Sequence, residues 1–115
     1  MSDSSAPSIR TVLHPVTDLP KAKAVYTALL GAEPTADAPY YVGYDVGGQH
    51  IGLVPNSTES GPVAYWHVPD IAAKLAEVTE AGGVVKQLAH DVGGGRLVAT
   101  VTDPDGNVLG LLQDR

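Results

Sequence analysis

Apolar and polar residues follow the same order twice along this chain. Each half begins with a mostly apolar segment, continues with an apolar stripe at helical spacing, and ends with short segments of alternating character. In the first half the stripe lies between Asp18, which suits a helix N-cap, and Gly31, which suits the C-terminal stop. In the second half Asp70 precedes a similar stripe. The pattern therefore predicts one capped helix in each half.

The two halves also correspond residue by residue. Asp18 and Asp70, like Gly31 and Gly83, are 52 positions apart. Repeats of this length mark structural units that complete each other's core. With only two copies, the repeat indicates a paired-module domain.

Strand-like segments surround both predicted helices. Residues 40–46 and 49–54 flank Gly47-Gly48, which is a strong signal for a two-residue hairpin turn. A second hairpin is expected around the turn formers Asp103 to Asn107. His90 and the glycine run after Asp91 are expected in a flexible loop. Further strands are expected at 8–16, 63–68, 84–88, 96–102 and 107–113.

These elements predict an α+β fold in which paired βαβββ modules form a curved mixed sheet around a cavity. The modules are expected at residues 8–56 and 62–115, within a single domain spanning 8–115. Residues 1–7 are small and polar and lack the pattern of a signal peptide, so we expect a short disordered lead-in.

Composition excludes several classes of function. The formal net charge is −6, and the few Lys and Arg residues are scattered, which argues against a nucleic-acid partner. No apolar run is long enough to span a bilayer, so no membrane partner is expected. The chain has no cysteine, which excludes disulfides and thiolate ligands and fits a cytoplasmic location.

Three segments resemble the vicinal-oxygen-chelate superfamily, which includes glyoxalase I, extradiol dioxygenases and the bleomycin- and fosfomycin-resistance proteins. The segments are residues 16–31, 66–71 and 103–107. The resemblance implies a cavity in a curved sheet and often a homodimer. In the enzymes it also implies a divalent metal, held by His, Gln or Glu at four recurring places.

Those four metal positions fall on Thr11, Gly52, Val63 and Gly110 in this chain. Glycine and valine offer no side-chain donor, and a single threonine hydroxyl is a poor ligand. Because catalytic metals of this kind need about three protein ligands, we expect neither a metal nor a cofactor.

Strand alternation selects the candidate cavity residues. With Gly47-Gly48 as the turn, Asp45 faces His50, and Tyr41 shares their side of the sheet. Glycines on this face and its counterpart, at 43, 52 and 110, predict vacant volume for water or ligand. His14, Tyr44 and Trp66 are expected on the helix-packed sides. The expected ligand-binding residues are Tyr41, Asp45, His50, Tyr65 and His67.

The function we expect is the binding or sequestration of a small, planar or partly aromatic molecule without a metal. The alternative is an enzyme of lyase, isomerase or dioxygenase type. It would use a displaced metal site built from His50, His67 and Asp45, or metal-free acid–base catalysis by His50 with Asp45. A vestigial cavity, or histidines that are merely solvated at its rim, are the other readings. We favour the binding protein, whose ligand the sequence does not name.

Overall fold

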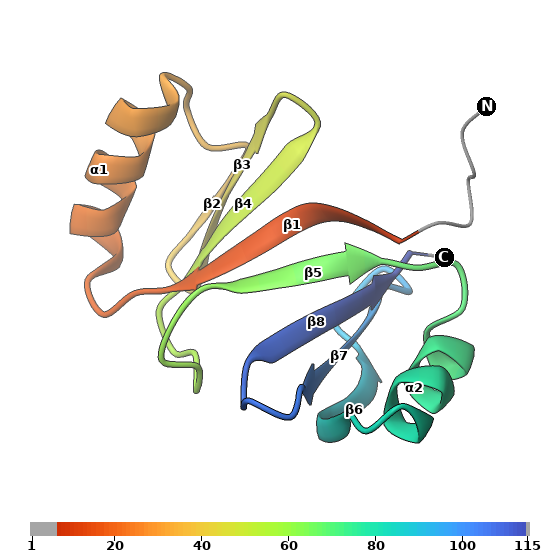
Figure 1. The fold of residues 1–115 in the computed structure, drawn as a ribbon. Coiled ribbons are helices and arrows are strands. Elements are labelled where there is room, and N and C mark those ends of the chain that lie inside the picture. The colour runs from red at the N-terminus through yellow and green to blue at the C-terminus, as the bar shows by residue number, and fades with distance from the viewer. Residues whose placement is uncertain (1–6, 115) are drawn as a thin grey trace. The chain divides into compact units, whose positions relative to one another are not determined.

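The computed structural model describes residues 7–114 and divides into two compact units. One comprises residues 10–64, and the other comprises residues 65–114 with 7–9. Along the chain, strand, helix and three strands occur in order and then repeat, so the predicted α+β fold with paired βαβββ modules is confirmed (Figure 1). Of the predicted lead-in, residues 1–6 lie outside the described residues.

The unit of residues 10–64 has four strands in the order β2-β3-β4-β1, with β1 parallel to β4 and the other pairs antiparallel. Gly47 and Gly48 both have positive φ, 58° and 80°, as a tight hairpin turn of the I′ type requires. The predicted register is confirmed, because Asp45 pairs with His50. The elements are β1 (Ser8–Pro15), α1 (Leu19–Leu30), β2 (Ala36–Ala38), β3 (Tyr41–Val46) and β4 (Gln49–Val54).

Helix α1 is capped as predicted and packs on the strands of its own unit. The Asp18 carboxylate accepts a hydrogen bond from the Lys21 N–H at 3.0 Å, and Gly31 adopts a left-handed conformation with φ of 64°. Tyr44 is fully buried beneath the helix, where its hydroxyl contacts Thr27 Oγ1 at 2.8 Å. The predicted helix-packed side of β3 is therefore confirmed.

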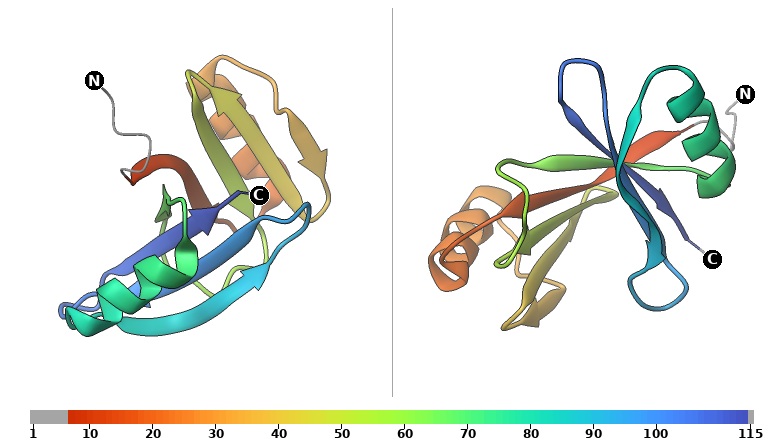
Figure 2. Two further views of the ribbon diagram at one scale, coloured as in Figure 1. Left: turned by 90° about the vertical axis from the view of Figure 1, so that its right-hand side faces the viewer. Right: turned by 90° about the horizontal axis from the view of Figure 1, so that it is seen from below.

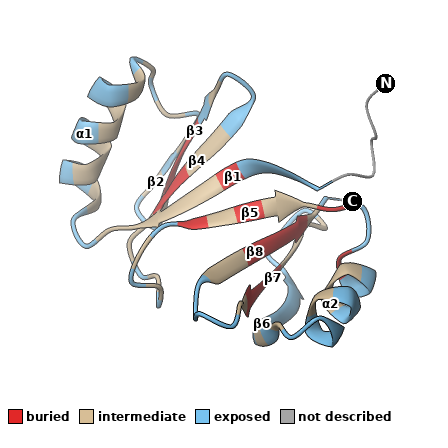
Figure 3. Ribbon diagram, in the orientation of Figure 1, coloured by how far each residue is buried: buried red, intermediate tan, exposed pale blue. Residues whose placement is uncertain are grey.

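The unit of residues 65–114 repeats this arrangement with the strand order β5-β8-β7-β6 (Figure 2). Asp70 caps its helix by accepting from the Ala73 N–H at 3.1 Å. Trp66 packs against the cluster of Ile71 and Leu111 on the helix side, as predicted. Buried residues concentrate on β7 and β8 (Figure 3). The elements are β5 (Val63–His67), α2 (Ile71–Glu80), β6 (Val84–Asp91), β7 (Leu97–Thr102) and β8 (Val108–Gln113).

The prediction of a loop around His90 is wrong. β6 continues to Asp91, and His90 pairs with Val98 of β7. Two register irregularities interrupt the β6–β7 ladder, and pairing resumes beyond each of them. Cross-strand pairing thus extends β6 beyond the apolar segment that predicted it. Within the described part of the chain, no helix is long and apolar enough to cross a membrane.

Candidate functional site

Four side chains of the unit of residues 10–64 form a continuous hydrogen-bonded chain, called here the polar chain. Thr35 Oγ1 donates to Asp45 Oδ2 at 2.5 Å. Asp45 Oδ1 lies 2.9 Å from His50 Nδ1, and His50 Nε2 lies 2.5 Å from Tyr41 Oη. The rings of Tyr41 and His50 are nearly parallel, with centroids 6.1 Å apart and planes 12° apart. Both ring nitrogens of His50 are therefore engaged.

The β3–β4 hairpin places three members of the polar chain. Tyr41 and Asp45 are four residues apart on β3 and so share one face, and the hairpin register sets His50 of β4 opposite Asp45. Sequence reasoning had predicted this shared face and the Asp45–His50 contact, and both are confirmed. Whether these residues bind a ligand stays a prediction at this point.

Thr35 is a member that sequence reasoning missed. It lies in the connection before β2, where its backbone N–H donates to the Gly43 carbonyl at 2.8 Å. That backbone bond holds the hydroxyl beside Asp45. No pattern in the sequence indicates this contact, because it depends on the path of a connecting segment.

The prediction of vacant volume at Gly43, Gly52 and Gly110 is wrong. A Cβ added at Gly52 would lie 2.6 Å from Leu13 and 2.9 Å from Tyr41 Cε1, and one at Gly43 would lie 2.8 Å from His50 Cε1. Aromatic rings cover these glycines because a glycine in a strand has no side chain, and a neighbouring ring can then lie flat on the sheet at that position. The space is therefore occupied by the candidate residues themselves.

The unit of residues 65–114 covers its own glycine in the same way. Tyr65 pairs with Gly110, and a Cβ at Gly110 would lie 2.5 Å from Tyr65 Cδ2. His67 follows on the same face of β5, with a side chain only 10% exposed and Nδ1 3.8 Å from Asp114. Asp114 also accepts from Arg96 at 2.7 Å and 3.3 Å. Tyr65 and His67 thus share a face, as predicted.

Thr100 is a second residue that sequence reasoning missed. It pairs with Gly110 in the β7–β8 ladder, so it lies in the same cross-strand row as Tyr65. Thr100 is 3% exposed, and its hydroxyl oxygen has no hydrogen-bond partner within the described residues. A buried polar atom of this kind calls for a partner such as water or a ligand. Its signal was a polar residue within the apolar strand of residues 97–102.

His14 contributes to packing, as predicted, and not to the polar chain. Its Nδ1 lies 3.3 Å from Tyr26 Oη, and the two rings are 5.1 Å apart. Partial burial lowers the pKa of His14 below its ordinary value of 6.5, because desolvation disfavours the charged imidazolium. His14 therefore remains neutral in the folded protein near neutral pH.

The residues present do not fit the metal that the resemblance implies. Thr11 is the only one of the four expected positions with a side-chain donor, while Gly52 and Gly110 lie beneath tyrosine rings. Among residues 7–114, no group of three or more His, Asp or Glu side chains is arranged to hold a metal ion. The usual places therefore supply one side-chain donor, and the pair formed by His50 and Asp45 supplies two, so each falls short of the three ligands that such a metal needs.

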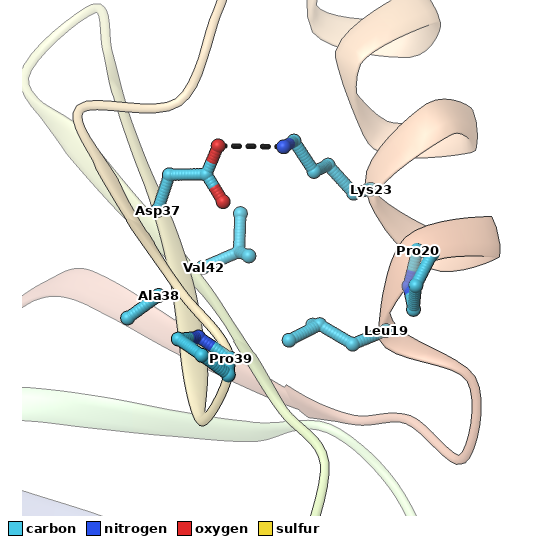
Figure 4. A pocket seen from close by; sticks show the side chains of 7 residues that line it. All are labelled: Leu19, Pro20, Lys23, Asp37, Ala38, Pro39 and Val42. Atoms are coloured by element: carbon cyan, nitrogen blue, oxygen red, sulfur yellow. Dashed lines mark hydrogen bonds and ion pairs between the residues drawn. The ribbon is translucent and has the colours of Figure 1, made fainter.

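A groove lies on the opposite side of β3, between α1 and the β2–β3 strands (Figure 4). Its volume is about 490 Å³, and Lys23 Nζ crosses it to reach Asp37 Oδ2 at 2.5 Å. The hydrogen bond to Asp37 raises the pKa of Lys23. The remaining lining is apolar and offers no acid–base group beyond this ion pair. The lining residues are Leu19, Pro20, Lys23, Asp37, Ala38, Pro39 and Val42.

A repeated βαβββ order with a helix on one face of each set of strands defines a class of α+β proteins. The model of the Glyoxalase/Bleomycin resistance protein/Dioxygenase superfamily matches residues 8–111. The chain belongs to this superfamily, and the predicted resemblance is confirmed. No curated protein matches the chain.

Several solved structures share the fold. A superfamily member from Vibrio splendidus has a TM-score of 0.73 at 19% identity, covering 96% of this chain and 100% of that chain. Methylmalonyl-CoA epimerase from Mycobacterium tuberculosis has a TM-score of 0.71 at 18% identity, covering 100% and 93%. The Mn(II)-bound glyoxalase from Novosphingobium aromaticivorans has a TM-score of 0.69 at 22% identity, covering 92% of this chain but 38% of that chain. At these identities the likeness shows the fold alone.

Proposed function

We propose that this protein binds a small, planar or partly aromatic molecule without a metal ion. The observation that carries the proposal is the polar chain, which sets the Tyr41 and His50 rings flat beside each other with their polar atoms linked to Asp45. A flat aromatic wall with a few fixed polar groups is the usual composition of a small-molecule site. Sequestration needs affinity and no chemistry, so the loss of metal ligands does not impair it.

The unit of residues 65–114 supports the same proposal independently. Its Tyr65–Gly110–Thr100 row again combines an aromatic ring with a polar atom, and the buried Thr100 hydroxyl has unused hydrogen-bonding capacity within the described residues. An unsatisfied buried hydroxyl costs about 1–3 kcal/mol, which a ligand or water would recover. We include Tyr65 and His67 among the proposed ligand contacts for this reason.

Binding is tested by measuring the melting temperature of the protein with a panel of planar aromatic compounds, followed by calorimetric titration of those that raise it. A ligand that binds only the native state at 100 times its Kd stabilises that state by about 2.7 kcal/mol. Tyr41→Ala should weaken binding by roughly fivefold or more, because truncation of an aromatic residue that anchors a ligand costs more than about 1 kcal/mol. The matched control is Tyr40→Ala, since Tyr40 is 74% exposed. Equal loss in both variants, or no loss in either, contradicts the proposal.

An enzyme is the second candidate, favoured by the link from Asp45 through His50 to Tyr41. This arrangement has the parts of an acid–base pair oriented by a carboxylate. The structural neighbours named above include an epimerase and a glyoxalase. Metal analysis of protein purified without chelator tests whether such an enzyme would use a displaced metal site. Stoichiometric metal that is lost on replacing His50 or His67 would support the displaced site.

Homodimerisation and a cytoplasmic location stay predictions. The homodimer rests on the family resemblance. Light scattering at micromolar concentration checks it, and a monomeric mass would contradict it. The location rests on the cysteine-free composition and is checked by cell fractionation.

A further inference from the structure

We propose that Tyr41, His50 and Asp45 form a proton relay that accepts the proton of a weakly acidic hydroxyl group on the bound ligand. This inference rests on the proposed binding function and goes further, because it names the ligand's chemistry and its charge when bound. The ligand would be a conjugated or aromatic molecule with an acidic hydroxyl, held as its anion.

The direction of the relay follows from the acceptor at its end. An ionised carboxylate only accepts hydrogen bonds, so Asp45 Oδ1 requires that His50 Nδ1 carry a proton. In the neutral imidazole Nε2 is then bare and accepts a hydrogen bond. The 2.5 Å contact at Nε2 is therefore a bond donated by the Tyr41 hydroxyl. Tyr41 Oη thus directs its own proton towards His50 and acts as an acceptor towards a ligand.

The end of the relay is held in place from two sides. Thr35 Oγ1 donates to the second oxygen of Asp45, which fixes the carboxylate plane with Oδ1 towards His50. His50 is 23% exposed at its side chain, whereas Asp45 is 61% exposed. Asp45 Oδ1 lies 2.9 Å from His50 Nδ1, so the carboxylate adjoins the ring that receives the proton. The relay therefore ends at a carboxylate whose position is fixed by two hydrogen bonds.

The proton transfers balance without any further reactant. The ligand hydroxyl donates its proton to Tyr41 Oη while the Tyr41 proton moves to His50 Nε2. The ligand oxygen becomes an anion, and His50 becomes an imidazolium beside the Asp45 carboxylate. Reversal on release restores the neutral ligand, tyrosine and histidine. Only a hydroxyl made acidic by conjugation gives up its proton readily in such a site, which excludes simple alcohols.

The probe for this relay is 4-nitrophenol, whose anion is coloured and whose neutral form is not. The experiment titrates absorbance against pH for the free probe and for the probe bound to the full-length protein. Bound to the wild type, the probe should ionise at a pH about one unit lower than free probe. Once its proton has passed to the relay, the bound anion accepts a hydrogen bond from Tyr41, and hydrogen bonding to the charged form lowers a pKa. The reference ligand is 4-nitroanisole, which has the same ring but no proton to give.

Variants separate the relay from simple binding. Tyr41→Phe keeps the ring and should bind the probe with its ionisation returned to the free value, as should His50→Gln. Asp45 is a positioning residue, so Asp45→Asn should move the ionisation of the bound probe only part of the way back to the free value. Thr35→Val should have a smaller effect of the same kind. Thr35→Ser keeps the hydroxyl and should ionise the probe as the wild type does. Tyr40→Phe and His90→Gln are the matched controls, and they should behave as the wild type.

The outcomes distinguish the two proposals. Binding of both probes to the wild type without a shift in the ionisation of 4-nitrophenol overturns the relay and leaves the binding function standing. A shift that persists in Tyr41→Phe and His50→Gln also overturns the relay, because another group would then hold the proton. Absence of binding by both probes overturns the relay and counts against the binding function. A shift that is lost in Tyr41→Phe and His50→Gln and kept in the two controls supports the relay.

Discussion

At the scale of single residues, the main feature is the pairing of a glycine with a tyrosine ring in each unit. Tyr41 lies over Gly52, and Tyr65 lies over Gly110. These glycines stand where the family resemblance implies metal ligands. The tyrosines thus occupy the space that larger ligand side chains would need, and they contribute hydroxyl groups of their own. An aromatic ring therefore lies against each of these two expected ligand positions.

This feature predicts that side chains are poorly tolerated at position 110. Gly110→Ala should lower the free energy of unfolding by about 1–3 kcal/mol, because its Cβ would meet the Tyr65 ring within 2.5–2.8 Å. Urea unfolding measures the change. The matched control is Gly61→Ala, since a Cβ there meets no atom within 4 Å. If both variants were equally stable, Tyr65 would not cover Gly110.

At the scale of elements, the helices and hairpins were the most predictable parts of the chain. Asp18 and Asp70 predict helix starts because a carboxylate satisfies N–H groups that no helical carbonyl reaches, and both caps are present. Gly47-Gly48 fixed the hairpin register and thereby placed Asp45 beside His50. The extension of β6 past His90 was not predictable, because it depends on pairing with β7 rather than on local character.

The two caps lead to a matched prediction. Asp18→Ala and Asp70→Ala should each lower the free energy of unfolding by about 1 kcal/mol, since each removes one acceptor for a first-turn N–H group. Thr17→Ala, next to the first cap, should change it by less than about 0.5 kcal/mol as a surface substitution. Chemical denaturation followed by circular dichroism gives the values. A cap variant as stable as Thr17→Ala would contradict the assignment.

At the scale of the whole molecule, the fold class and the family followed from the repeated pattern, whereas the site followed only in part. Strand alternation was sufficient to bring together Tyr41, Asp45 and His50, because all three lie on one hairpin. Thr35 reaches Asp45 from a connection without regular structure, and the burial of the Thr100 hydroxyl without a partner among the described residues depends on how β7 packs. Contacts of these two kinds arise in three dimensions, and periodicity does not encode them.

The central claim is that the protein binds its ligand without a metal ion. The most direct test is calorimetric titration of 4-nitrophenol into protein that has been treated exhaustively with chelator, compared with the same protein supplied with Mn²⁺ or Zn²⁺. The account predicts the same Kd in all three samples and weaker binding in Tyr41→Ala, because the tyrosine rings lie at the glycines where the family's ligands would stand. Binding that disappears with chelator and returns with either metal would contradict it.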